Sequence, residues 1–217
     1  MRTNPFYDAW LFLIGSTGDH QSTGVGWLLT LLFLVLFAAS LWIAFKNWQQ
    51  DPTQRTTGHL ATWFMRVMIG AMWFQGSLWK LPLPVSGAFK FWTEALSRHA
   101  AFDVHKWIVT NVFVPALPII DPLVYLTELS LAVAFILGFL VRPLGIIGML
   151  FVAHIWLGLY QNTDEWPWQY VFLIFVQGFF VVTNAGRSLG LDALLVRAAL
   201  GPFAGDGLIA RLYRKLA

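Results

Sequence analysis

Five long apolar runs limit the folds open to this chain more than any other feature. A helix that crosses a hydrocarbon core about 30 Å thick needs about 20 apolar residues. Of the 217 residues, 58% are hydrophobic and only 12% are charged, against about 25% charged in soluble proteins. The sequence therefore predicts an all-α, polytopic helical bundle in a lipid bilayer, with spans at residues 23–45, 59–81, 119–141, 143–160 and 167–183.

Two segments are predicted to lie outside the hydrocarbon core. Residues 82–118 hold two short amphipathic patterns, with Ser86 and Asp103 as their expected N-caps. The tail at residues 196–217 places leucines opposite arginines and a lysine. We therefore expect a basic amphipathic helix that lies on the membrane surface.

The distribution of lysine and arginine predicts the orientation. The N-terminal tail, the loop 82–118 and the turn 161–166 hold four basic residues, whereas the opposite side holds eight. Because basic residues accumulate on the cytoplasmic side, we expect the N-terminus and the loop 82–118 outside and the C-terminus in the cytoplasm. The expected location is the inner (cytoplasmic) membrane.

The residue types present exclude several cofactors and partners. The chain has no cysteine, so a dithiol centre, an iron–sulfur cluster and thiolate metal sites are excluded. Haem is not expected either, because a haem site within a membrane bundle normally takes two histidines, and His154 is the single histidine away from the ends of the predicted spans. His99, Asp103 and His105 match no standard helix-borne spacing, so no metal site is predicted. The basic C-terminus indicates a cytoplasmic face, and no nucleic-acid partner is expected.

Polar side chains form a stripe on each of two predicted spans. Arg66, Trp73 and Lys80 recur at helical spacing on one face of the second span. Asp121, Tyr125 and Glu128 form a similar stripe on the third, and Arg142 follows on that same side. Such a stripe is typical of a helix that faces the bundle interior and not lipid.

The depth of these groups predicts an ion pair between Arg66 and Glu128. At 1.5 Å per residue, Glu128 lies about 13–14 Å and Gln177 about 15 Å below the outer surface, with His154 at the same level. Arg66 lies about 5–8 Å nearer the cytoplasm, within reach of its own side chain. Lys80 is expected at the outer interface, where it extends toward water.

Three interpretations of this polar interior remain open. The ion pair of Arg66 and Glu128 could serve only to fix the register of the helices. Together with His154, it could line a pocket for a ligand or a quinone. A path for protons or ions is the third interpretation.

Three stretches of the chain resemble the DoxX/DoxD group of small membrane proteins. They are MRVMIGAMWFQGSLWKL, LTELSLAVAFILGFLVRPLGIIGML and NAGRSLGLDALL. The resemblance implies a four-helix DoxX-like core over residues 59–195. Residues 1–58 then supply a tail, an extra N-terminal transmembrane helix and a linker.

The resemblance also implies a function, because the group is named for a thiosulfate:quinone oxidoreductase subunit. It carries over to the charged positions Arg66, Lys80, Glu128, Arg142 and Arg187. The first hypothesis is quinone-linked oxidation of a reduced sulfur compound such as thiosulfate, with quinone as the cofactor.

In this hypothesis Arg66 and Lys80 position the anion or the quinone oxygen. Glu128 accepts a proton and His154 orients the ring, and these two are the predicted catalytic residues. Further predicted binding residues are Trp73, Tyr125 and Gln177.

The alternative hypothesis is a non-catalytic anchor or accessory subunit of a respiratory or redox complex. Its partner would be another membrane or extracytoplasmic redox subunit. The docking surface would be formed by exposed aromatic residues of the outer loop, namely Phe89, Trp92 and Trp107. A small-solute transporter is disfavoured by the small number of spans and the lack of an inverted repeat.

Overall fold

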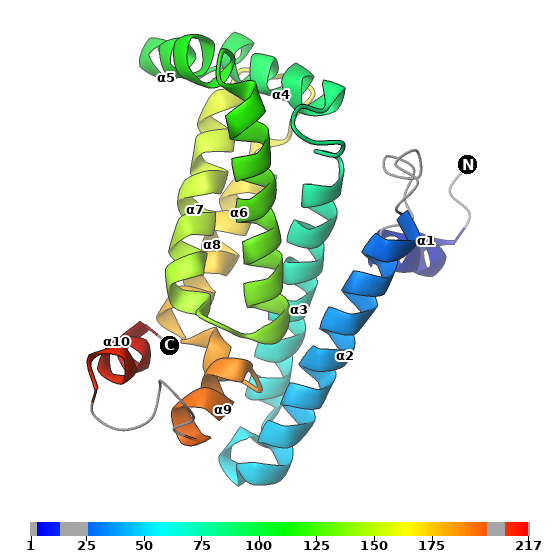
Figure 1. The fold of residues 1–217 in the computed structure, drawn as a ribbon, viewed down its shortest axis with the longest axis vertical. Helices are drawn as coiled ribbons and strands as arrows, with labels where there is room; N and C mark the ends of the chain where they lie inside the picture. Colours follow the sequence, from blue (N-terminus) through cyan, green and yellow to red (C-terminus); the bar gives the residue numbers. More distant parts are fainter. Residues whose placement is uncertain (1–3, 14–25, 199–206, 217) are drawn as a thin grey trace.

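The computed structural model describes residues 4–13, 26–198 and 207–216, and this part of the chain is helical with no strand. Five long helices run along the long axis of the molecule (Figure 1). They are α2 (Gly26–Gln50), α3 (Thr57–Leu78), α6 (Leu117–Leu137), α7 (Val141–Gly158) and α8 (Pro167–Val182). The prediction of an all-helical chain is confirmed, and each predicted apolar run coincides with one of these helices.

Three of the long helices are long and apolar enough to cross a membrane. They span Trp27–Gln50, Leu117–Leu137 and Val141–Gly158, and α8 is apolar but shorter. Many of their large apolar side chains are exposed, including Leu31, Ile119 and Leu150. A surface of this kind is compatible with lipid and not with water, so the protein is membrane-associated.

The shorter helices lie at the ends of the long ones. Figure 1 shows α4 (Gly87–Arg98) and α5 (Asp103–Ile108) across one end, and α9 (Leu191–Ala198) and α10 (Leu208–Leu216) at the other. The remaining short elements are α1 (Pro5–Leu13), η2 (Pro52–Gln54), η3 (Val109–Phe113) and η4 (Ala185–Arg187).

One of the two predicted caps in the loop 82–118 is correct. The side chain of Ser86 accepts a hydrogen bond from Phe89 N and caps α4. Asp103 is not the cap of α5: the extended residue Phe102 holds that position, without a side-chain bond. Asp103 is instead the first helical residue. There its negative charge interacts favourably with the positive end of the helix dipole.

Small residues allow α3 and α6 to approach closely. A Cβ atom at Gly70 would lie 2.7 Å from Ile136 Cγ1 and 2.8 Å from Ile136 N, so only glycine fits there. Gly138 ends α6 with a φ of 73°, the left-handed conformation that favours glycine at a helix C-terminus. The chain then turns at once into α7, which makes α6 and α7 a tight antiparallel hairpin.

A single hydrophobic cluster joins all five long helices. It contains Phe33 of α2, Phe74 of α3, Phe135 of α6, Val152 of α7 and Phe180 of α8. Because α2 contributes a buried phenylalanine, it is packed onto the bundle, where it lies against α3 and α6. The cluster holds the helices in the register that decides which polar groups meet.

The predicted C-terminal helix is present as α10, in the described part of the tail. Ala210 and Tyr213 are buried against the rest of the protein, whereas Leu208 and Leu212 are exposed. One face of α10 is therefore packed against the protein, and the opposite face exposes its leucines. Its contact with a membrane surface stays a prediction.

Candidate ligand-binding cavity

Glu128 forms its ion pair with Lys80, and the predicted pair with Arg66 is wrong. Lys80 Nζ lies 2.6 Å from Glu128 Oε2 and also donates a hydrogen bond to Gly76 O at 2.8 Å. Both residues are buried, with exposed fractions of 2% for Lys80 and 4% for Glu128. The expectation that Lys80 extends toward water at the outer interface is wrong as well.

The register of α3 and α6 explains the correction. Gly70 lies against Ile136, and Gly76 lies beside the Glu128 carboxylate, at 3.8 Å from Oε2 to a Cβ placed there. Arg66 is therefore level with the C-terminal end of α6, seven residues beyond Glu128. That offset is about 10 Å along the helix, more than the separation estimated from the ends of the apolar runs.

Arg66 is buried at the opposite end of the bundle. It donates hydrogen bonds to Phe135 O at 2.9 Å and to Ser188 O at 3.4 Å, and it interacts electrostatically with Asp192. The Asp192 carboxylate in turn accepts hydrogen bonds from Leu140 N and from the Tyr213 hydroxyl. Arg66 and Asp192 thus tie α3, the α6–α7 turn, α9 and α10 together.

Arg142 and Arg187, which the resemblance groups with Arg66 and Glu128 as a structural ion-pair set, also lie near this end. Arg142 donates a hydrogen bond to Lys215 O at 3.1 Å, and Arg187 interacts electrostatically with Tyr213. Burial raises the pKa of Asp192, the acid at the centre of this cluster. The five charged positions that the resemblance implies therefore fall into two groups, Lys80 with Glu128 at the cavity and the three arginines near the α6–α7 turn and α10.

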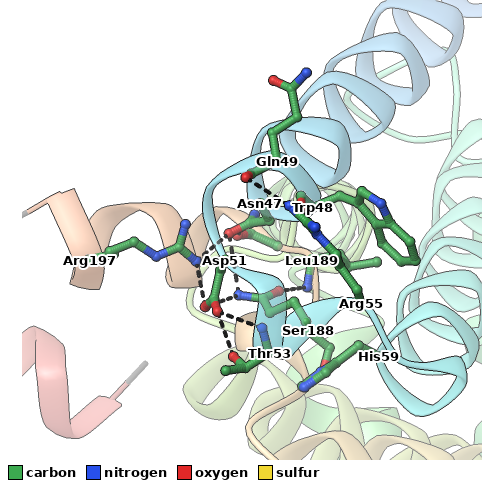
Figure 2. Close-up of polar contacts among 12 residues, drawn as sticks. Asn47, Trp48, Gln49, Asp51, Thr53, Arg55, His59, Ser188, Leu189 and Arg197 are labelled. Atoms are coloured by element: carbon green, nitrogen blue, oxygen red, sulfur yellow. Dashed lines mark hydrogen bonds and ion pairs between the residues drawn. The ribbon is translucent and has the colours of Figure 1, made fainter.

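A polar network also fastens the end of α2 to the segment after α8 (Figure 2). Asn47 Nδ2 donates to Gly190 O at 2.9 Å, and Gln54 Oε1 accepts from Leu189 N at 2.7 Å. Arg197 forms an ion pair with Asp51 at 3.1 Å. Sequence reasoning missed this network, because its partners are more than 130 residues apart and follow no local spacing.

A cavity of about 670 Å³ lies beneath α4, between α6 and α7. Most of its wall is apolar and aromatic, but the Lys80–Glu128 pair and His154 reach it. The lining includes Trp79, Lys80, Phe89, Trp92, Phe113, Glu128, Phe151, His154 and Tyr170. Ligand pockets in proteins are typically of this size, mostly apolar with a few polar groups.

Two histidines meet at the end of the cavity next to α5. His105 of α5 and His154 of α7 lie 2.9 Å apart between Nε2 and Nδ1, so one ring donates and the other accepts. Burial lowers the pKa of His105 below its usual value, which favours the neutral ring. The spacing of the two histidines in the sequence does not indicate this pair. They are 49 residues apart, and only the packing of α5 against α7 brings them together.

No group of three or more histidine, cysteine, aspartate or glutamate side chains that could hold a metal occurs in the described part of the chain. His105 and His154 are two potential metal ligands, and Asp103 does not join them to form a group of three. The expected absence of a metal site stays a prediction.

The remaining predicted binding residues are not among those that line this cavity. Trp73 is buried behind it and packs against Phe151, with ring centroids 5.8 Å apart. Gln177 donates to Leu173 O, and its side chain fills the space that a Cβ at Gly148 would take. Tyr125 is half-buried on α6. Of the seven predicted site residues, the structure brings Lys80, Glu128 and His154 to the cavity.

Phe89 also departs from the sequence-based expectation. It was predicted as an exposed docking residue, but it is buried and lines the cavity. Trp92 lines the cavity and is partly exposed, whereas Trp107 is exposed. The inward face of α4 thus forms the roof of the cavity.

The arrangement can bind a molecule with an apolar body and a polar group. Lys80 can donate to a carbonyl or an anion, and Glu128 and the histidine pair can exchange protons. Comparison with protein-family models, with curated proteins and with solved structures found no match for this chain, so the resemblance to the DoxX/DoxD group stays a prediction.

Proposed function

We propose that this protein is a quinone-binding membrane subunit of the DoxX/DoxD type, which takes part in the oxidation of a reduced sulfur compound such as thiosulfate. The observation that carries the proposal is the cavity of about 670 Å³, in which aromatic walls surround the buried Lys80–Glu128 pair. A quinone has the matching chemistry, namely a flat apolar ring with two carbonyl acceptors.

The proposal includes a multi-pass topology in the inner membrane. All five long helices cross the bilayer, and α3, α6, α7 and α8 form the four-helix core with α2 as the additional helix. The loop that carries α4 and α5 lies outside and the C-terminus lies in the cytoplasm. The count of basic residues, four against eight, supports this orientation.

The residues of the cavity have distinct roles in the proposal. The Lys80 ammonium would donate a hydrogen bond to one carbonyl of a bound quinone. Glu128 and His154 would accept protons from water and pass them on to the ring. Reduction takes up two electrons and two protons, and two thiosulfate ions that join as tetrathionate provide the two electrons. Arg66 takes no part, because it lies at the opposite end of the bundle.

A paired substitution on α6 tests the proposal. Val124 lines the cavity, whereas Leu126 of the same helix does not and is 57% exposed. Val124→Trp should fill the cavity and abolish thiosulfate-dependent quinone reduction in isolated membranes, and Leu126→Trp should retain it. Equal activity in both variants, or none in the wild type, would overturn the proposal.

An accessory subunit is the second candidate function. The outer surface of α4 and α5 exposes Phe91, Phe102 and Trp107, a surface that fits a docked redox subunit. In that case a partner should co-purify in a fixed ratio and be lost in a Trp107→Ser variant. A chain that purifies alone from gently solubilised membranes would contradict this candidate.

A further inference from the structure

We propose that the cavity opens sideways into the lipid between α6 and α7, and that its ligand is a long-tailed, membrane-soluble quinone whose tail lies in this opening. This inference rests on the proposed function, because it names the class of quinone and its route. The inference is based on two parts of the cavity. Its inner wall carries the buried, polar Lys80 and Glu128, and its rim carries the exposed, apolar Leu123 and Leu150.

The rim consists of residues that line the cavity and are also exposed. Leu123 of α6 is 56% exposed and Leu150 of α7 is 67% exposed, and both belong to the lining. Ile147, one turn from Leu150, is exposed and belongs to the lining too. The cavity therefore reaches the protein surface between the two helices.

The opening lies toward the end of the α6–α7 hairpin that is remote from its turn. The turn at Gly138 holds α6 and α7 together at one end, and Gly148 lets α7 pack against Gln177 of α8. Toward the other end the bulky Phe113 and Phe151 line the cavity. The cavity thus lies near α4 and α5, which lie across that end in Figure 1.

The depth of the rim places it in hydrocarbon and not in water. Leu123 is six residues from the start of α6, about 9 Å along the helix, and Leu150 is eight residues from the end of α7, about 12 Å. A hydrocarbon core is about 30 Å thick, so both residues face acyl chains when α6 and α7 cross the bilayer. A ligand that passes between them must dissolve in lipid.

The inner wall selects the head group and the rim selects the tail. Lys80 and Glu128 are buried, so they are reached only through the cavity. A quinone ring can contact them while an isoprenoid tail extends past Leu123 and Leu150 into the bilayer. The tail stays in apolar surroundings throughout, because the rim and the lipid chains are both hydrocarbon.

Tail length and two matched tryptophan substitutions test this inference. The probes are a benzoquinone with a methyl substituent and the same head group with a ten-carbon tail, titrated onto protein in lipid nanodiscs. Leu150→Trp narrows the opening, and Ile146→Trp is its control, because Ile146 is 49% exposed on α7 but does not line the cavity.

We expect Leu150→Trp to weaken binding of the long-tailed probe at least tenfold and to change binding of the short probe less than twofold. Ile146→Trp should leave both affinities unchanged. Long-tail affinity within twofold of wild type in Leu150→Trp would overturn the lateral opening but leave the quinone site standing. Failure of both probes to bind the wild type would overturn the quinone site and the inference together.

A second measurement needs no substitution. A long-tailed quinone with a photoreactive group at the far end of its tail should label the wild-type protein on α6 and α7 around Leu123 and Leu150. Labelling confined to α4 and α5 would show access from the aqueous side and overturn the inference.

Discussion

The Lys80 ammonium lies 2.6 Å from the Glu128 carboxylate, with both groups buried in the wall of the cavity. The pair joins the end of α3 to the middle of α6, and each charge compensates the other where water is excluded. Removal of a single partner from a buried pair typically costs about 3–5 kcal/mol, whereas replacement of both partners by apolar groups is often nearly neutral.

Single and double substitutions should therefore differ in their effect on stability. We expect Lys80→Met to lower the free energy of unfolding by about 3–5 kcal/mol, because it leaves Glu128 unpaired. The double variant Lys80→Met/Glu128→Leu should regain most of this loss. Unfolding by denaturant in detergent measures both, and additive losses in the double variant would contradict the pairing.

Gly70 should not tolerate a larger side chain. A Cβ at this position would lie 2.7 Å from Ile136 Cγ1 and against its backbone, so Gly70→Ala should force α3 and α6 apart. We expect a loss of about 1–3 kcal/mol, measured by thermal unfolding in detergent. Gly87→Ala is the control, because a Cβ there meets nothing within 4 Å. Equal stability of the two variants would contradict the close approach of the helices.

The His105–His154 hydrogen bond should make stability depend on pH. Burial lowers the pKa of His105 in the folded protein below its ordinary 6.5, so the unfolded chain binds the proton first as the pH falls. Stability is therefore complete above pH 6.5 and declines as acidification moves below that value.

A His105→Gln variant isolates this effect. Its amide can still hydrogen-bond to His154 but does not titrate, so its unfolding temperature should decline less between pH 7 and pH 5 than that of the wild type. Parallel declines in the two proteins would mean that His105 does not contribute to the pH dependence.

The contact between Tyr213 and Asp192 should hold α10 in place. The Tyr213 hydroxyl donates to Asp192 Oδ1 at 2.6 Å, both residues are buried, and they lie 21 residues apart. A hydrogen bond to a charged group contributes about 1.5–3 kcal/mol, so Tyr213→Phe should release α10 and increase proteolytic cleavage of the C-terminal tail. Tyr160→Phe is the control, because Tyr160 is exposed. An unchanged cleavage rate in Tyr213→Phe would contradict this role.

The elements of the fold were predictable because their signals are local. Apolar runs of about 20 residues mark the long helices, and the serine before α4 marks its start. The predicted N-cap of α5 was wrong by one residue. Phe102 takes the extended cap position, and Asp103 lies in the first turn of the helix.

The site was only partly predictable, because it depends on register. The sequence placed Arg66, Lys80 and Glu128 on polar stripes and His154 at the level of Glu128. It paired Glu128 with Arg66 and extended Lys80 toward water, because local spacing does not say which cation meets Glu128. The close contact of Gly70 with Ile136 sets the register of α3 and α6, and this register brings Lys80 to Glu128. The two residues in contact are 66 positions apart in the chain. The His105–His154 pair likewise arises only when α5 lies across the end of α7.

Native mass spectrometry of the protein from its own membrane tests the central claim most directly, namely that the cavity with its buried ion pair binds a quinone. We expect one quinone per chain in the wild type and none in Lys80→Met/Glu128→Leu, which should remain folded. A wild-type chain that carries no quinone, or a double variant that keeps it, would contradict the claim.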